Sequence, residues 1–585
     1  MVQVIGDVVH QAAPTSIGTA DFIWAYDDAP KVAVVTIGFG TADGTVANTS
    51  SYSRGYTDGT NSYCVSSRSQ HGLAASSNTD SVGRDDRVIY LINGTTNASV
   101  VEASFQQWLT NPGGIRLNFT TVGSAYLVTV KMFGGDGLSA VVGSGRSPAS
   151  IGGATSITTS FSPTYVECMT RFGTLHNTFI ADPVISTGYA ISGTQRAMTW
   201  GDKDATSPTQ SYAYRDDTVA LRKITTAATG VGVSIGSFGI AGFTATTTDV
   251  AESVTFAYLA IGLQSGGSRF ALYTYDTPTA TGSADDLTAG WKPQLVEYTM
   301  TQLTATATLA TTGPAGAVGW TAISANAQGS ASIAFRDAVA TTDTQSETNS
   351  TAVDFYFHAG TQSHAATFTS FQSTGVRLNW GTVDVTAKKW IGVALEQSIL
   401  SGSVSAVSGS ASLSNAGTEI IPGDLSAASS SSSASLDGTL IVPADISIVS
   451  GDSSTDIRGT TVIPGVLDAV ADTSTLHMDA VSGEVDGELA LTASDSVLSM
   501  SGTVIIPGVM ALAAGSSKLF VNGNTGYIDA VIGMVARPAR LAVKAGSNRT
   551  EYVSETAVYA SGPDAVLYGS GPIGYLYGEG PQVVM

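Results

Sequence analysis

The chain has 585 residues, only 12% of them charged, and its formal net charge at pH 7 is −21. This acidic balance disfavours binding to nucleic acids or to anionic membranes, because both depend on basic patches. The low charge and the 65 glycines are typical of short strands joined by tight turns. We therefore predict an all-β chain without long amphipathic helices.

The first segment, residues 1–12, has neither the basic nor the apolar region of a secretory signal. We find no transmembrane span and expect no membrane insertion. The two cysteines, Cys64 and Cys168, lie far apart in sequence and match neither a metal-ligand spacing nor a disulfide framework. We expect both to be unpaired thiols, in a chain made in a reducing cytoplasm.

The next part of the chain contains a long repeat. Three expected strands open with a proline, at Pro30, Pro163 and Pro293, which stand at nearly equal intervals. A second motif follows in each copy, and the three versions read Gly114-Ile-Arg-Leu-Asn-Phe119, Gly242-Phe-Thr-Ala-Thr-Thr247 and Gly375-Val-Arg-Leu-Asn-Trp380. Short strands with turns at this spacing predict three tandem antiparallel β-sandwich domains, at 13–145, 146–285 and 286–398.

The third copy shows the alternation that a half-buried strand requires. Val376, Leu378 and Trp380 occupy one set of alternate positions, and Arg377 and Asn379 occupy the other. Because successive side chains of a strand point to opposite faces, the three apolar residues should face the core.

Residues 399–535 carry a shorter repeat, with a period of roughly 21 residues. Its six versions end in the apolar residues Val404, Leu425, Ile446, Leu467, Leu489 and Met510. A second apolar position recurs at Leu436, Ile457, Met478, Met500 and Val521. This short period predicts a repetitive shaft, either a β-prism or a β-solenoid, because such a unit must stack on copies of itself or on sister chains. Three chains could complete each layer, and the serine tract at 429–433 should form a flexible loop tip.

The C-terminal segment, residues 536–585, is rich in tyrosine, glycine and proline. Tyr559, Tyr568 and Tyr577 recur every nine residues, and Tyr575 lies beside the last of them. Exposed aromatic side chains stack on sugar rings and anchor interfaces, so these four tyrosines are candidates for glycan binding. The alternative is that they pack against one another between chains.

Candidates for catalysis and metal binding are weak. His358 and His364 do not match a zinc motif and are expected on a surface strand and loop. Paired acids follow arginine at Arg84-Asp85-Asp86-Arg87 and at Arg215-Asp216-Asp217, in matching places of the first two copies. Such pairs could bind calcium or sugar, or serve glycoside hydrolysis, but a turn that closes a strand explains their duplication better. We therefore expect no catalytic, cofactor-binding or metal-binding residues and no enzyme activity.

The three long copies resemble a module of tailed-bacteriophage virion proteins. The residues that carry the resemblance are, by copy, Pro30, Phe105, Gly114, Leu117, Asn118 and Phe119; Pro163, Phe238, Gly242 and Phe243; and Pro293, Phe368, Gly375, Leu378, Asn379 and Trp380. The second copy departs from the pattern, because Thr244-Ala-Thr246 stands where the others have Arg-Leu-Asn.

The resemblance implies a structural role in the virion, after synthesis in the host cytoplasm. The favoured role is a tail fibre or tail-tip protein that contacts host surface glycans, is joined to other virion proteins and forms a homotrimer. The alternative is a head-surface fibre or capsid decoration protein. A third reading, from another functional class, is a glycan-degrading tailspike, which would require carboxylates that converge in a groove.

Overall fold

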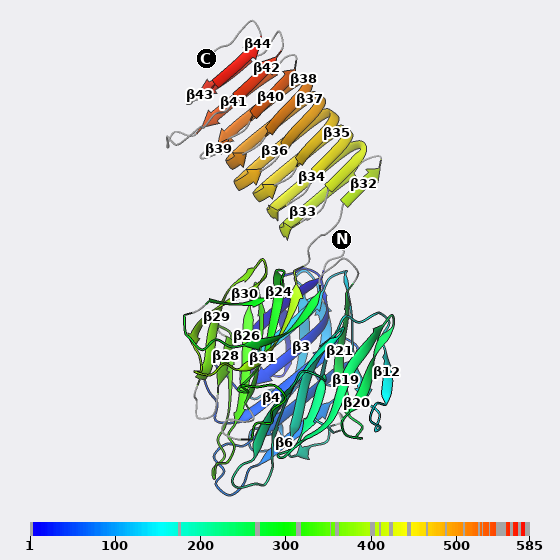
Figure 1. Ribbon diagram of the computed structural model, residues 1–585, viewed down its shortest axis with the longest axis vertical. Coiled ribbons are helices and arrows are strands. Elements are labelled where there is room, and N and C mark those ends of the chain that lie inside the picture. The colour runs from blue at the N-terminus through cyan, green and yellow to red at the C-terminus, as the bar shows by residue number, and fades with distance from the viewer. Residues whose placement is uncertain are drawn as a thin grey trace. The chain divides into compact units, whose positions relative to one another are not determined.

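Every helix or strand assigned in the described residues is a β-strand, and the computed structural model forms two compact units, Met1–Ser398 and Ile399–Met585 (Figure 1). The prediction of an all-β chain is therefore confirmed for this part of the chain. No helix among these residues is long and apolar enough to span a membrane. The structure describes residues 4–173, 177–263, 269–282, 284–311, 317–351, 353–356, 362–397, 404–408, 411–420, 425–441, 446–463, 466–485, 488–506, 509–523, 527–528, 531–536, 539–545, 557–561, 566–570 and 575–579.

The first ten strands form two antiparallel sheets. The six-stranded sheet has the order β1-β10-β3-β4-β5-β6, and the four-stranded sheet has the order β2-β9-β8-β7. The bounds are β1 Ile5–Ala12, β2 Gly18–Ile23, β3 Pro30–Gly38, β4 Ser50–Thr57, β5 Ser62–Ser69, β6 Thr79–Arg84, β7 Ile89–Ile92, β8 Ser99–Leu109, β9 Gly114–Thr121 and β10 Leu127–Gly134.

The next eleven strands form a second pair of antiparallel sheets. Their orders are β11-β21-β13-β15-β16-β17 and β12-β20-β19-β18, while the short β14 pairs with β6 of the first group. The bounds are β11 Leu138–Arg146, β12 Ala154–Thr158, β13 Tyr165–Thr170, β14 Ile180–Ala181, β15 Val184–Ile191, β16 Thr194–Asp202, β17 Ser211–Asp216, β18 Leu221–Ile224, β19 Thr229–Gly239, β20 Gly242–Thr248 and β21 Thr255–Leu263.

A third pair of antiparallel sheets completes the first unit. Their orders are β22-β31-β24-β25-β26-β27 and β23-β30-β29-β28. The bounds are β22 Phe270–Asp276, β23 Ala284–Thr288, β24 Pro293–Thr301, β25 Val318–Ser324, β26 Gln328–Phe335, β27 Thr344–Asn349, β28 Val353–Tyr356, β29 Gln362–Gln372, β30 Gly375–Thr382 and β31 Lys389–Glu396.

The three groups share one topology, and we name them repeat 1 (5–134), repeat 2 (138–263) and repeat 3 (270–396). In each, the first strand pairs with the last, and the last pairs with the strand that the proline motif marks. Repeats 1 and 2 therefore begin one strand before the boundaries at 13 and 146 drawn from the sequence, and the boundary at 286 falls inside β23, the second strand of repeat 3. The difference arises because β1, β11 and β22 carry no shared motif, so sequence similarity begins only later.

A separate core fills the space between the two sheets of each repeat. In repeat 3 the buried side chains of this core include Val376, Leu378 and Trp380, while Arg377 and Asn379 are exposed. The predicted alternation of this strand is thus confirmed. Corresponding cores lie between the sheets of repeat 1 and of repeat 2, so each repeat is β-sandwich-like.

The glycine that opens the second motif is required by the backbone. Gly114 and Gly242, the first residues of β9 and β20, have φ angles of 155° and 152°. A Cβ atom on Gly114 would lie 2.3 Å from the Phe22 carbonyl oxygen, and one on Gly242 would lie 2.1 Å from the Ile157 carbonyl oxygen. Any side chain would therefore separate β9 from β2 and β20 from β12.

A fourth, larger core joins the three repeats. Buried residues from all three six-stranded sheets form it, and at its centre Tyr52, Trp200 and Trp320 contact one another with ring centroids 5.0–5.7 Å apart. One aromatic residue comes from each repeat, so each six-stranded sheet has a face against its own four-stranded sheet and a face against the other repeats. We call residues 4–397 the ring unit.

The second unit consists of parallel strands, and we call it the ladder unit. Each long strand pairs with the next one along the chain, so that Leu425 lies opposite Ile446 and Leu467 lies opposite Leu489. The pairing thus follows the short repeat of the sequence. The bounds are β32 Val404–Ser408, β33 Ala411–Ile420, β34 Leu425–Ile441, β35 Ile446–Ile463, β36 Val466–Val485, β37 Glu488–Ile506, β38 Val509–Gly523, β39 Tyr527–Ile528, β40 Val531–Ala536, β41 Ala539–Ala545, β42 Ala557–Ser561, β43 Val566–Ser570 and β44 Tyr575–Glu579.

Candidate functional site

The four candidate tyrosines lie on the last three strands of the ladder unit. Tyr559 of β42 and Tyr577 of β44 lie opposite each other in the parallel pairing. Tyr575 lies opposite Ala557, and Tyr568 of β43 lies opposite Ala542 of β41. The backbone thus brings two of the four tyrosines to the same register position and places the other two elsewhere.

The paired acids close strands, as their duplication indicates. Arg84, the last residue of β6, binds both carboxylate oxygens of Asp86 at 2.9 Å. Arg215 of β17 binds Asp217 at 3.1 and 3.2 Å. The second acid of each pair is engaged by the arginine two residues before it, which is the geometry of a stabilised turn and not of two carboxylates converging on a substrate.

The histidine pair is only partly described, because His358 lies outside the described residues. His364 is fully buried in β29 between Trp380 and Trp390. Its Nε2 is 2.9 Å from the Thr277 hydroxyl, and burial lowers its pKa to about 4. This histidine is therefore a core residue, and its expected place on the surface is wrong. No group of three potential ligands is found in the described part of the chain.

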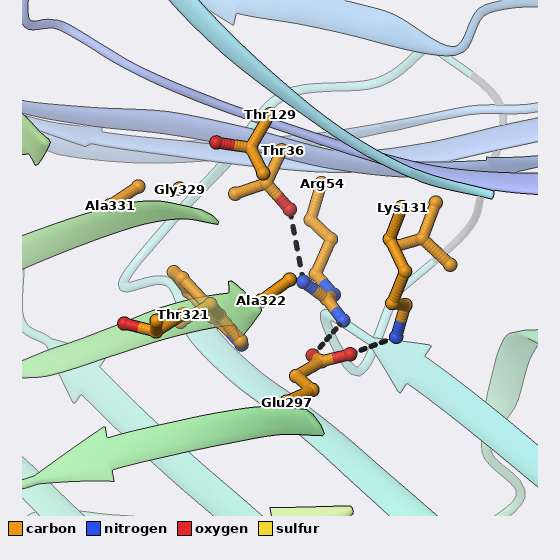
Figure 2. Close-up of a pocket in the computed structure, with 11 residues that line it drawn as sticks. Thr36, Arg54, Thr129, Lys131, Glu297, Thr321, Ala322, Gly329 and Ala331 are labelled. Carbon is orange, nitrogen blue, oxygen red and sulfur yellow. Dashed lines mark hydrogen bonds and ion pairs between the residues drawn. The ribbon is translucent and has the colours of Figure 1, made fainter. Parts of the chain in front are cut away.

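The most unusual feature, which no sequence motif predicts, is a cluster of four buried charges where the three repeats meet. Repeat 1 provides Arg54 and Lys131, repeat 2 provides Glu167, and repeat 3 provides Glu297. All four residues are at most 3% exposed. We call this set the charge cluster; Figure 2 shows the three members contributed by repeats 1 and 3 pointing toward one another.

Each cation of the charge cluster bridges both carboxylates. Arg54 Nη2 donates to Glu167 Oε1 at 2.5 Å and also to Glu297 Oε1. Lys131 Nζ donates to Glu167 Oε2 at 3.0 Å and also to Glu297 Oε2. The four groups therefore form a closed cycle of alternating sign with no net formal charge, which is the condition under which buried charges are tolerated.

Neutral donors complete the coordination of the carboxylates. Tyr56 and Tyr165 donate to the two oxygens of Glu167 at 3.2 and 3.0 Å. Tyr189 donates to Glu297 at 3.0 Å. Because burial is offset by so many partners, the carboxylates can stay ionised inside the protein.

The pKa values show how burial and pairing compete. Burial alone would raise the pKa of Glu167, but Lys131 and Arg54 reverse this effect and lower it to about 2. Burial lowers the pKa of Lys131 to about 8 in spite of Glu167. At neutral pH, Glu167 is therefore ionised and Lys131 is mainly protonated.

The space beside the charge cluster is too small for a substrate. A cavity of about 10 Å³ lies between Arg54, Lys131, Glu297 and Trp320 (Figure 2), which is room for about one water molecule. Ligand pockets are on the order of several hundred Å³. We therefore assign the charge cluster to the assembly of the ring unit and not to substrate chemistry.

Loops from neighbouring repeats pair with one edge strand of each six-stranded sheet. The loop after each proline-led strand reaches the edge strand of another repeat, where Ala47 pairs with Ser346, Ile180 with Ser81, and Ala310 with Ala213. Repeat 1 thus reaches repeat 3, repeat 3 reaches repeat 2, and repeat 2 reaches repeat 1. This cyclic arrangement pairs part of one edge of each sheet, which would otherwise be open to pairing with other chains.

Another buried acid lies at the junction of repeats 1 and 2. Asp202 ends β16, is 3% exposed, and accepts a hydrogen bond from the Ser69 hydroxyl at 2.7 Å. Burial, reinforced by Asp204, Asp337 and Asp182, raises its pKa to about 7. This carboxyl therefore changes its charge near neutral pH.

Only one signal in the sequence could have revealed the charge cluster. Glu167 and Glu297 each stand four residues after the motif proline, inside apolar strands, whereas repeat 1 has Val34 at that position. A repeated acid in a buried strand requires a cation, but nothing in the sequence identifies Arg54 and Lys131 as its partners, since each is far along the chain from at least one of the acids. Compared with known protein families and with curated proteins, the chain matches none.

Proposed function

We propose that the protein is a structural component of a tailed-phage virion, a tail fibre or tail-tip protein that contacts the host cell surface. The observation that carries the proposal is that both units are built by repetition of a β unit. The ring unit uses one topology three times, and the ladder unit pairs each copy of its short repeat with the next. Such an arrangement suits a rigid connector better than a reaction cavity.

The ladder unit acts in this proposal as a β-solenoid shaft. Strand β35 has 18 residues, which would span roughly 60 Å if straight, yet only residues 464–465 separate it from the parallel β36. Two residues cannot cross that distance, so each long strand must fold back within itself. The pairing skips Gly451 between Ser450 and Asp452, which supports a bend there.

The end of the ladder unit supports a shaft that narrows. Tyr559 pairs with Tyr577, so one turn here corresponds to two of the nine-residue units. Leu425 and Ile446, which pair in an earlier turn, are separated by a longer stretch of chain. Tyrosines at this end, repeated on many copies in one particle, would bind host glycans through many weak contacts.

The ring unit acts in this proposal as three tandem β-sandwich domains that join the shaft to other virion proteins. Its charge cluster and one edge strand of each repeat are engaged within the unit, and its surface loops would contact the partners. Self-association of the chain into a homotrimer stays a prediction from the sequence.

The position of the protein in the particle tests the proposal. Antibodies raised against the purified chain should label the tail or tail tip of intact virions in electron micrographs. Label over the head would instead favour the decoration role, and absence of the chain from virions purified from the phage that encodes it would contradict the proposal.

A competition experiment tests contact with the host. Cells incubated with the purified protein should adsorb phage more slowly, and a variant with Tyr559, Tyr568, Tyr575 and Tyr577 changed to serine should compete less well. Unchanged adsorption would count against the host-contact role. Release of reducing sugars from host polysaccharide would favour the tailspike.

A further inference from the structure

We propose that the charge cluster determines which repeats can close the ring: repeat 1 must combine with two repeats that each carry a carboxylate, as repeats 2 and 3 do, and rings made from the same repeat of three chains are excluded. The proposal rests on the contacts of Arg54, Lys131, Glu167 and Glu297 and is independent of the virion role. The three repeats share one topology, but the charged residues that hold them together differ from repeat to repeat.

The four charged residues lie on three different strands of the shared topology, and none of the three repeats carries all of them. Glu167 and Glu297 stand where repeat 1 has Val34. The residue opposite this position on the last strand differs between the repeats: Lys131 is opposite Val34, Leu259 is opposite Glu167, and Val393 is opposite Glu297. Cations therefore come only from repeat 1, and carboxylates only from repeats 2 and 3.

Arg54 also has no charged counterpart in the other two repeats. It lies opposite Thr36 on β3, and the corresponding residues of the other repeats are Thr187, opposite Met169, and Trp320, opposite Thr299. The guanidinium is thus present once in the ring. Its 2.9 Å bond to the Thr36 hydroxyl and its cation–π contact with Trp320, 5.8 Å from the ring centroid, fix its direction toward the two acids.

Rings made from one kind of repeat alone would leave charges unpaired. Three copies of repeat 1 would bury three arginines and three lysines with no carboxylate. Three copies of repeat 2 or of repeat 3 would bury three carboxylates with no cation. A buried charge without its partner is among the most unfavourable arrangements in a protein interior, so such rings are strongly disfavoured.

The apolar contacts alone would not discriminate in this way. The central core is built from aliphatic and aromatic residues in all three repeats, and hydrophobic burial is not directional. Because the repeats share one topology, like repeats could close a ring with similar apolar burial. Polar residues inside an apolar interface commonly supply the missing specificity.

Engineered cysteine pairs in the full-length chain distinguish the two kinds of ring. Ala47→Cys with Ser346→Cys joins repeats 1 and 3 where they now pair. Ala47→Cys with Ser81→Cys is the matched control, because Ser81 lies on the edge strand of repeat 1, where it now pairs with Ile180. In a ring of three copies of repeat 1, the second pair would crosslink separate chains.

The result expected after unfolding, refolding and oxidation is a crosslink within one chain for the first pair and no interchain product for the second. The buried Cys64 and Cys168 should give no crosslink in the chain without added cysteines. Interchain product from the Ala47/Ser81 pair in the otherwise unchanged protein would overturn the proposal.

The same pairs in a charge-free background test the role of the charges. Arg54→Met, Lys131→Met, Glu167→Gln and Glu297→Gln together should raise the interchain product of the Ala47/Ser81 pair by about tenfold or more. A charge-free chain that still closes only on itself would overturn the proposal. If this variant does not fold, Lys131→Met with Glu297→Gln keeps the Arg54–Glu167 pair and should give a smaller rise; no rise would again overturn the proposal.

Discussion

The two units use repetition in opposite ways. In the ladder unit, neighbouring copies are nearly interchangeable, because each strand pairs in register with the next copy along the chain. In the ring unit, the copies share a topology but have become different where they meet, as Glu167, Glu297 and Val34 show. A linear stack can be extended or shortened by one copy, whereas a closed ring needs every member.

Removal of one whole repeat from the ring should have the largest effect. Deletion of residues 270–396 would remove Glu297 and expose apolar faces of the central core formed with repeats 1 and 2. We expect loss of cooperative folding of the remaining ring unit, measured by circular dichroism and denaturant titration. A cooperative transition similar to that of the intact chain would contradict the idea of an obligate ring.

Loss of one acid from the charge cluster should be the next largest effect. Glu167→Gln leaves Arg54 and Lys131 with a single carboxylate, and disruption of a buried ion pair costs about 3–5 kcal/mol. Chemical denaturation of the ring unit measures this loss. Asp86→Asn, which removes the ion pairs of a half-exposed carboxylate with Arg84 and Arg87, is the control and should cost less than about 1 kcal/mol.

The sequence is informative where the signal is local. Period-2 alternation identifies the strand of Val376, Leu378 and Trp380, and the repeated glycine at Gly114 and Gly242 reflects a backbone that excludes side chains. The cyclic order of the repeats could not be predicted, because it depends on contacts such as Ala47 with Ser346 between residues far apart in the chain. Buried charges are hidden for the same reason.

The serine tract illustrates the opposite error. The sequence predicts a loop tip at residues 429–433, because serine-rich runs are common in flexible segments. They lie instead within β34, where Ser429 pairs with Ser450 and Ser433 with Ser454 of β35. The pairing of each copy with the next overrides the local preference, so composition alone misleads inside a repeat.

The pH dependence of stability should reveal two buried acids with opposite effects. The pKa of Glu167 is about 2 in the folded chain, below its ordinary value, so its contribution is present above about pH 4.5 and is lost as the pH falls toward 2. The pKa of Asp202 is raised to about 7, so the folded state binds this proton more tightly and loses stability as the pH rises from about 4 to 7.

As far as these two groups decide it, the free energy of unfolding of the ring unit should be greatest near pH 4–5. It should fall toward pH 7 by about a few kcal/mol at most, because over this range the unfolded chain releases the Asp202 proton that the folded chain still holds. Denaturant midpoints measured at steps of one pH unit would trace this profile. Asp202→Asn should flatten the decline between pH 4 and 7 and leave the acid limb in place. An unchanged profile would show that Asp202 does not titrate in this range.

Removal of one copy from the ladder should have the smallest effect on the rest of the chain. Deletion of residues 446–466 joins Asp445 to Leu467 and restores the pattern Val-Pro-Ala-Asp-Leu at the junction. Leu425, which now pairs with Ile446, would then pair with Leu467 in the same register. Because each copy contacts only its neighbours, the ladder should shorten by one turn without a change in its pairing, and the free energy of unfolding of the ring unit should change by less than about 0.5 kcal/mol. Hydrogen exchange of the backbone amides on both sides of the junction measures the pairing.

A shorter deletion, of residues 446–455, is the matched control, since it shifts the register by half a turn and should abolish protection from exchange beyond the junction. Equal protection in the two variants would mean that the ladder is not held by its register, and the contrast between an extensible stack and a closed ring would fail.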